Sequence, residues 1–232
     1  MAIRVFASNS VRGVTEALLP AFRSPDGAPV EVVFDSAKAL LRRIAAGEPV
    51  DVALLGTPTL EDLAIQGLID RSSMRPLASS GVGVGVKSGT PHPKIDTVDA
   101  FRQMLLDAES IAHTTEGASG MYFSGLIDTL GLGAQVRPKT RTRPGGLVGE
   151  VLVAGGAQVG IQQISELRAV PGVDVVGPLP AGVQKIFGNS AGVFAGCANP
   201  KGAAALIAFL TSAEATPVYE AHGLTAGQED MT

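Results

Sequence analysis

The sequence predicts an α/β protein in which helices cover both faces of largely parallel sheets. The first observation is an alternation of compact apolar runs, at 3–7, 30–34 and 50–55, with helical stripes between them. Runs rich in β-branched residues are typical of strands that are covered on both faces of a parallel sheet. The second observation is that a similar alternation begins again after residue 87. A doubly wound sheet is therefore predicted in each half of the chain.

The helices are predicted from apolar residues spaced three or four positions apart. Val11, Val14, Leu18 and Phe22 mark the first helical face, and a second helix covers 37–44. Thr57 is predicted as the N-cap of a third helix, with Pro58 at its first position. The later predicted elements are helices around 98–105, 122–130, 147–152 and 204–210, strands at 110–113, 159–162 and 173–176, and an extended segment at 183–197.

Glycine alternates with valine from Gly81 to Val86. Such a strand suits a crossing between two lobes, and it equally suits a strand on which a helix packs closely. The crossing interpretation divides the chain into a first lobe of residues 1–80 plus 188–232 and an inserted second lobe of residues 83–185. The crossovers are expected near 79–84 and 186–194, and a cleft is expected between the lobes.

Composition excludes several classes of function. The 232 residues carry 18 Lys+Arg against 22 Asp+Glu, a net charge of −4, without a basic run, so neither nucleic-acid binding nor a polybasic membrane anchor is expected. Cys197 is the only cysteine and is expected to be a buried small hydrophobe. Three scattered histidines and no carboxylate cluster predict neither a metal site nor a metal cofactor, and no other cofactor is expected. No apolar run approaches the roughly 20 residues of a membrane span.

The sequence as it stands has no signal-peptide pattern, which predicts a cytoplasmic protein. A periplasmic location is expected instead if a signal peptide has been removed.

Small hydroxyl and amide side chains follow four of the predicted strands. Ligands of open α/β sheets bind beyond the carboxyl ends of the strands, and neutral donors there can hold an anion through bonds of about 1.5–3 kcal/mol each. Any one of these residues could instead be an ordinary helix cap, but their recurrence favours a binding site. The candidates are Ser8, Asn9, Ser10, Ser36, Lys38, Thr115, Ser119, Gly120, Gln162 and Gln163.

Three segments resemble a known family: 5–10, 32–37 and 47–55, with sequences VFASNS, VVFDSA and GEPVDVALL. They are similar to molybdate-type solute-binding proteins, and the similarity extends over nearly the whole chain. This resemblance implies the two-lobed class II periplasmic-binding-protein fold and, for an exported protein, an ABC permease as partner. It also implies oxyanion-binding hydroxyls at Ser8 or Ser10, at Ser36 and near Ser119.

The chain departs from the molybdate pattern at two turns. It has Lys38 after Ser36-Ala37, where the family typically has a Ser-Gly pair, and Gln162-Gln163 where a late tyrosine is typical. A lysine and two glutamines suit a larger, carboxylate-bearing ligand. Segments 160–166 and 176–180 resemble a branch of the family that includes the bacterial aconitate isomerases.

Two functions therefore stay open. The first is a binding protein that closes on a small carboxylate or oxyanion. The second is a cofactor-independent isomerase of an unsaturated tricarboxylate, which needs a base; His113, Lys38 and Glu116 are the candidates. Each has a structural alternative: His113 as a buried structural histidine, Lys38 as a solvated helix residue, and Glu116 as a partner of a helix dipole.

Overall fold

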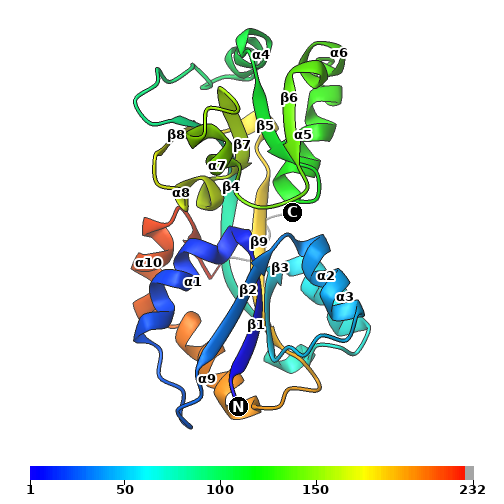
Figure 1. The fold of residues 1–232 in the computed structure, drawn as a ribbon, viewed down its shortest axis with the longest axis vertical. Coiled ribbons are helices and arrows are strands. Elements are labelled where there is room, and N and C mark those ends of the chain that lie inside the picture. Colours follow the sequence, from blue (N-terminus) through cyan, green and yellow to red (C-terminus); the bar gives the residue numbers. More distant parts are fainter. Residues whose placement is uncertain (228–232) are drawn as a thin grey trace. The chain divides into compact units, whose positions relative to one another are not determined.

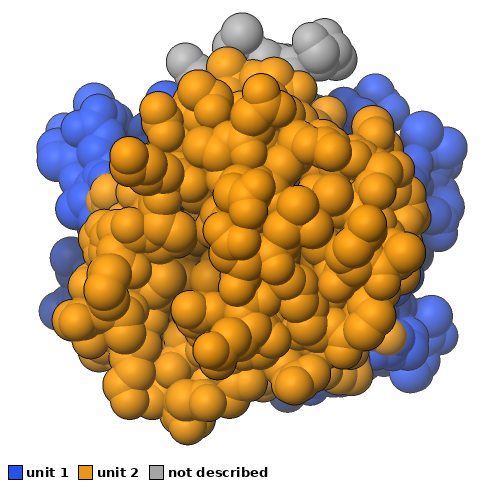
Figure 2. All heavy atoms as spheres, turned by 90° about the horizontal axis from the view of Figure 1, so that it is seen from above, with its two compact units in different colours: residues 1–79, 187–232 blue, residues 80–186 orange. Residues whose placement is uncertain are grey.

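The computed structural model describes residues 1–227, which form two compact units. Unit 1 contains residues 1–79 and the chain from residue 187 onward, and unit 2 contains residues 80–186. Figure 2 shows the atoms of each unit in its own colour. Two strands connect the units along the chain: β4 (Arg75–Lys87) and β9 (Ile186–Val193). The fold is α/β, with both faces of each sheet carrying helices (Figure 1).

Unit 1 is built on a sheet of order β2-β1-β3-β9, in which β1, β2 and β3 are parallel and β9 is antiparallel to β3. Two residues of β10 pair with Ala78 and Ser79 at the start of β4. The elements of unit 1 other than β4 and β9 are β1 (Ile3–Ser8), α1 (Arg12–Leu18), β2 (Val30–Asp35), α2 (Ala37–Ala45), β3 (Val52–Gly56), α3 (Thr57–Ile65), α9 (Pro200–Leu210), α10 (Thr216–Ala221) and β10 (Thr225–Ala226).

The sheet of unit 1 is covered on both faces, as the apolar runs predict. Ile3, Val5 and Ala7 of β1 belong to a core shared with α1, α9 and α10, whereas Phe6 belongs to a second core shared with α2 and α3. Figure 1 shows these two groups of helices on opposite sides of the strands. The alternation along β1 follows from the two-residue period of a strand.

Unit 2 is built on a sheet of order β4-β7-β5-β6, in which β7, β5 and β6 are parallel, and β4 is antiparallel to β7. Strand β8 is antiparallel to β4. The elements of unit 2 other than β4 are α4 (Val98–Asp107), β5 (Ile111–Thr114), α5 (Ala118–Thr129), α6 (Gly133–Val136), β6 (Thr140–Arg143), α7 (Val148–Val153), β7 (Val159–Gln163), α8 (Ile164–Arg168) and β8 (Val173–Pro178).

The glycines of β4 allow helix α8 to pack directly against the strand. A Cβ atom on Gly83 would lie 2.6 Å from Cγ1 of Ile164, and one on Gly85 would lie 2.9 Å from Cδ2 of Leu167. Real Cβ atoms do not approach other atoms this closely. Close packing of a helix thus explains the Val-Gly alternation, in a strand that also passes from unit 1 to unit 2.

Two local predictions are wrong. Thr57 is not an N-cap: Gly56 is, and Thr57 and Pro58 form the first turn of α3. The first helix ends at Leu18 and continues only as a 3-10 turn over Leu19–Ala21, because Pro20 has no N–H for the helical hydrogen bond.

Within residues 1–227, no helix is long and apolar enough to cross a membrane. The same described residues contain no group of three or more His, Cys, Asp or Glu that could hold a metal ion.

Candidate functional site

A group of buried hydroxyl and amide side chains lies at the carboxyl edge of the sheet of unit 1. The Ser8 and Ser10 hydroxyls are 2.7 Å apart, and they donate to Oδ1 of Asn189 at 3.1 and 2.8 Å. Asn189 reaches this edge because β9 is antiparallel to β3, which places Asn189 opposite Gly56. The Asn189 Nδ2 atom is buried and has no hydrogen-bond partner among the described residues. We call Ser8, Ser10 and Asn189 the unit 1 donor group.

The other candidates of unit 1 have different surroundings. Ser36 is buried and caps α2, since its hydroxyl accepts a hydrogen bond from the Ala39 N–H at 3.3 Å. Asn9 is also buried, between the two serines of the donor group. Lys38 is exposed. Its contact with a ligand stays a prediction.

In unit 2, the turn after β5 is held together by Thr114. A Cβ atom on Gly120 would lie 1.9 Å from the Thr114 carbonyl oxygen, and one on Gly117 would lie 2.5 Å from its hydroxyl. Both glycines are therefore required for α5 to begin against β5. This packing explains Gly120 without a ligand, whereas Ser119 beside it is a buried hydroxyl in the first turn of the helix.

The turns after β5 and β6 are joined by backbone hydrogen bonds. The N–H of Thr115 donates to the Arg143 carbonyl, and the N–H of Glu116 donates to the Pro144 carbonyl, both at 2.9 Å. The Arg143 guanidinium donates to Glu150 at 2.7 Å and to the Leu147 carbonyl at 3.1 Å. Arg143, the cation nearest these turns in the chain, is not predicted as a site residue, because its four-residue strand lacks an apolar run.

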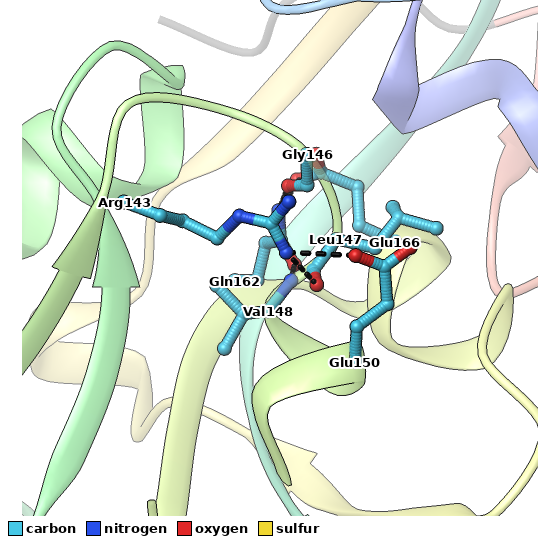
Figure 3. A network of polar contacts seen from close by, with 7 residues as sticks. All are labelled: Arg143, Gly146, Leu147, Val148, Glu150, Gln162 and Glu166. Carbon is cyan, nitrogen blue, oxygen red and sulfur yellow. Dashed lines mark hydrogen bonds and ion pairs between the residues drawn. The ribbon is translucent and has the colours of Figure 1, made fainter. Parts of the chain in front are cut away.

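Gln162 holds the turn before α7 in place (Figure 3). Its Oε1 accepts from the Val148 N–H at 2.7 Å, and its Nε2 donates to the Gly146 carbonyl at 2.9 Å and to Oε1 of Glu166 at 3.0 Å. Both donor hydrogens of the amide are thus used within the protein. We conclude that Gln162 supports the site, while its direct contact with a ligand stays a prediction.

Glu166 is a buried carboxyl group that was not among the predicted site residues. Burial raises its pKa from 4.5 to about 8, against the lowering effect of hydrogen bonds from the Gln163 backbone, Gln162 and Ser119. Gln163 is the N-cap of α8 and Glu166 is its third residue, the spacing of the back-bonding half of a capping box. The four-residue spacing of Gln162 and Glu166 is the only sequence signal that these two side chains could pair. The burial of Glu166 depends on tertiary packing, which the sequence does not show.

Three more buried polar atoms at this edge have no hydrogen-bond partner among the described residues: Thr114 Oγ1, Gln163 Oε1 and Ser165 Oγ. The backbone N–H of Ser165 donates to the Ser80 hydroxyl at 3.2 Å. Most buried polar groups in proteins have partners, so this many unpartnered atoms at one edge needs an explanation. Together with Ser119 and Glu166 they form what we call the unit 2 donor group.

His113 lies near this group but is enclosed by protein. Its ring packs edge-on against Phe123 with centroids 5.2 Å apart, and its Nδ1 is 3.0 Å from the Thr114 carbonyl. Burial lowers the pKa of the His113 imidazole. These contacts favour a neutral structural histidine, and its role as a base stays a prediction.

Comparison with known proteins places the chain in a family. A model described as "Bacterial extracellular solute-binding protein" matches residues 3–225, nearly the whole chain. The chain belongs to this family of bacterial extracellular solute-binding proteins.

One relative of this chain carries the name of an enzyme. An aconitate isomerase of a Pseudomonas species is 33% identical over 228 residues, which cover 96% of this chain and 87% of the relative.

Two solved structures share the fold. The periplasmic molybdate-binding protein of Azotobacter vinelandii has a TM-score of 0.81 at 18% identity, covering 97% of this chain and 100% of that one. The tungstate ABC transporter structure from Geobacter sulfurreducens has a TM-score of 0.71 at 14% identity, covering 95% and 98%. These neighbours confirm the predicted molybdate-type solute-binding fold.

Proposed function

We propose that this solute-binding protein binds a small polycarboxylate anion through buried polar side chains at the carboxyl edges of its sheets. The observation that carries the proposal is the set of buried, neutral polar atoms without protein partners at the carboxyl edges of the sheets, including Asn189 Nδ2 and Ser165 Oγ. Neutral donors can hold an anion without the cost of burying a fixed cation. A chain with a net charge of −4 can therefore still bind an anion, because the donors at the site decide the binding and the net charge does not.

A polycarboxylate is favoured over a compact oxyanion by the comparison with known relatives. The 33% identical relative is named for aconitate, a tricarboxylate, whereas the molybdate and tungstate proteins are below 20% identity.

A thermal-shift screen tests the ligand class. Citrate, cis-aconitate and trans-aconitate are expected to raise the melting temperature, and molybdate and sulfate are expected to do so less. A ligand at one hundred times its Kd stabilises the folded state by about 2.7 kcal/mol. Stabilisation by molybdate alone would contradict the polycarboxylate assignment.

Two variants then test the site itself, one in each unit. Asn189→Ala and Ser165→Ala each remove an unpartnered group, and each is expected to weaken binding of the best anion about tenfold or more. Ser72→Ala, an exposed serine of unit 1, is the matched control and should bind as the wild type does. Unchanged binding in both site variants would show that the anion binds elsewhere.

An isomerase is the second candidate function, and the aconitate isomerase relative is the observation that favours it. A base would remove a proton from the methylene beside the double bond, the double bond would shift by one position, and a proton would return at the far carbon. No atom is gained or lost. His113, Lys38 and Glu116 are the proposed bases from the sequence.

Incubation of the protein with trans-aconitate in deuterated water tests this second candidate. The expected product is cis-aconitate that has incorporated deuterium, measured by proton NMR. Substitution of the base, in His113→Gln, Lys38→Met or Glu116→Gln, should abolish the exchange while binding persists. Binding of trans-aconitate without conversion would leave the binding protein as the function.

Family membership also suggests an ABC permease as partner in an exported protein. Co-purification of this chain with a transmembrane permease, increased by the bound anion, is the expected result. A chain that works as an isomerase should show no such association.

A further inference from the structure

Arg12 is a cation at the carboxyl edge of the unit 1 sheet. It is the first residue of α1, which follows β1 through a short 3-10 turn (Figure 1). Its guanidinium carbon lies 5.0 Å from the centre of the Phe34 ring. Phe34 is the last but one residue of β2, and Asp35 after it pairs with Ser8 in the parallel register. The guanidinium is therefore held beside the end of β1, where the unit 1 donor group lies.

The position of Arg12 is unfavourable for helix α1 itself. The amino end of a helix carries a partial positive charge, so a cation in the first turn is repelled. Arg12 is paired with Glu16, one turn further along, with 3.4 Å between Nε and Oε1. A pair at this spacing is more stabilising when the acid precedes the base, and here the order is reversed. Helix stability thus does not account for an arginine at this position.

The guanidinium of Arg12 also has hydrogen-bonding capacity that the protein leaves unused. Its Nε atom is buried and has no hydrogen-bond partner among the described residues. The Phe34 ring contacts one face of the guanidinium, whereas the N–H donors of an arginine point outward in its plane. The side chain is 33% exposed, so this cation can meet an anion without the cost of full burial.

Asp35 does not compete for this cation. Phe34 packs against the core on the α1 face of the sheet. Because side chains alternate along a strand, Asp35 belongs to the opposite face. The Oδ1 of Asp35 accepts a hydrogen bond from the Ser36 N–H at 2.7 Å. Glu16 is thus the acid that a bound anion would replace at Arg12.

We propose that Arg12 is the cationic binding residue of unit 1, and that it takes one carboxylate of the bound polycarboxylate in place of Glu16. The unit 1 donor group then holds another carboxylate through the Asn189 amide. The planar fork of a guanidinium matches the two oxygens of a carboxylate, which an ammonium does not. The inference rests on the proposed function and deepens it, because two separate sites in one unit require a ligand with more than one carboxylate.

Isothermal titration calorimetry of the full chain with trans-aconitate provides the first test. Arg12→Gln is expected to weaken binding about tenfold, the effect of losing a charge-assisted hydrogen bond. Arg71→Gln removes the same charge from an exposed arginine of unit 1 and is the matched control. Arg71 lies toward the other edge of the sheet, since the Asp70 N–H donates to the carbonyl of Val193, which pairs with the first residue of β3. Its affinity should stay within about twofold of the wild type.

Two further variants separate ligand contact from a structural ion pair. Arg12→Lys keeps the charge and loses the planar fork, so it should bind about three- to fivefold more weakly. Glu16→Gln releases Arg12 and should bind trans-aconitate at least as tightly as the wild type. A purely structural pair would instead give Arg12→Gln and Glu16→Gln the same loss of melting temperature and wild-type affinity.

A ligand series locates the contact. Itaconate, mesaconate and (Z)-glutaconate each lack a different carboxyl group of trans-aconitate, and their affinities are measured by competition against it. The dicarboxylate without the group that Arg12 holds should bind Arg12→Gln as it binds the wild type. The other two should lose about tenfold, as trans-aconitate does. Equal losses for all three dicarboxylates would contradict a direct contact of Arg12 with one carboxylate.

The outcomes separate the two claims. Failure of citrate and both aconitates to bind the wild type would contradict the proposed function. Wild-type affinity for trans-aconitate in Arg12→Gln, or the same loss in Arg71→Gln, would overturn the role of Arg12 and leave the proposed function intact. Melting temperatures without ligand show which variants are folded. Arg12→Lys, which keeps a cation beside Glu16 and Phe34, carries the test if Arg12→Gln does not fold, and wild-type affinity in it would then overturn the role of Arg12.

Discussion

The donor groups of the two units differ in how far their hydrogen bonds are already satisfied. In unit 1, Ser8 and Ser10 donate to Asn189, and Nδ2 of Asn189 is the unpartnered atom of the group. In unit 2, hydroxyl and amide oxygens lack partners and lie at the same edge as a buried carboxyl. Unit 1 thus presents a fixed amide donor that does not titrate, and unit 2 presents hydroxyl groups that can either donate or accept. The difference suggests that sensitivity to pH belongs to unit 2.

The largest expected effect concerns the start of α5 in unit 2. Gly120→Ala forces a Cβ atom against the Thr114 carbonyl, and it should lower the free energy of unfolding by about 3 kcal/mol. Gly125→Ala, in the same helix with open space around it, should raise it by about 0.5–1 kcal/mol. Urea denaturation followed by circular dichroism measures both. Equal effects would show that Thr114 does not constrain this turn.

The next effect separates the two neighbouring glutamines. Gln162→Leu leaves the Val148 N–H and the Gly146 carbonyl without their partner, and it should cost about 2–3 kcal/mol of unfolding free energy. Gln163→Leu removes a buried Oε1 that has no partner among the described residues, and it should cost less than about 1 kcal/mol of unfolding free energy. A larger loss of stability in Gln163→Leu would reverse the roles assigned to the two residues.

The pH dependence of stability tests the buried carboxyl. The pKa of Glu166 is raised from 4.5 to about 8, so the folded state holds one more proton than the unfolded state between these values. The stability that Glu166 contributes is present below pH 4.5 and is lost as the pH rises toward 8, with a slope of at most about 1.4 kcal/mol per pH unit.

Chemical denaturation at several pH values measures this slope. Glu166→Gln should remove it, and Glu109→Gln should keep it. A slope of the same size in Glu166→Gln would assign the pH dependence to another group.

The smallest expected effect concerns Ser36 of unit 1, and it separates the capping of α2 from a contact with the ligand. Ser36→Ala removes the N-cap of α2 and should cost about 1 kcal/mol of unfolding free energy. Ser36→Asn keeps a capping oxygen and should retain most of the stability. Anion binding is measured in both variants by calorimetry. Wild-type affinity in Ser36→Asn would limit Ser36 to its capping role.

Much of the fold could be predicted because the strands of both units are buried on two faces and therefore read as apolar runs. Strand β6 could not, since its residues Thr140–Arg143 are polar and none of them is buried. The N-cap at Gly56 was missed because Thr57 is a better capping residue by type, while the backbone turns one residue earlier. The residue type alone is therefore a weak guide to the first residue of a helix, because the backbone path of the whole chain determines where the helix begins.

The candidate site was predictable in its location and less so in its roles. Strand order brings the turns after parallel strands to one edge, so Ser8 and Ser119 both lie near the carboxyl ends of strands, and their contact with a ligand stays a prediction. Asn189 was missed because β9 is antiparallel, so its contribution comes from inside a strand and not from a turn after one. Glu166 was missed because a short polar helix gives no sign of burial.

The inserted unit is closed on itself at the place where the chain enters and leaves it. The Val82 N–H donates to the Lys185 carbonyl at 3.1 Å, and the Leu179 N–H donates to the Val82 carbonyl at 3.0 Å, so the two ends of unit 2 are side by side. An insertion with adjacent ends needs little from its host chain. We therefore expect residues 80–186 to be exchangeable as one block with the corresponding residues of a relative, because both junctions lie at the same place in the fold.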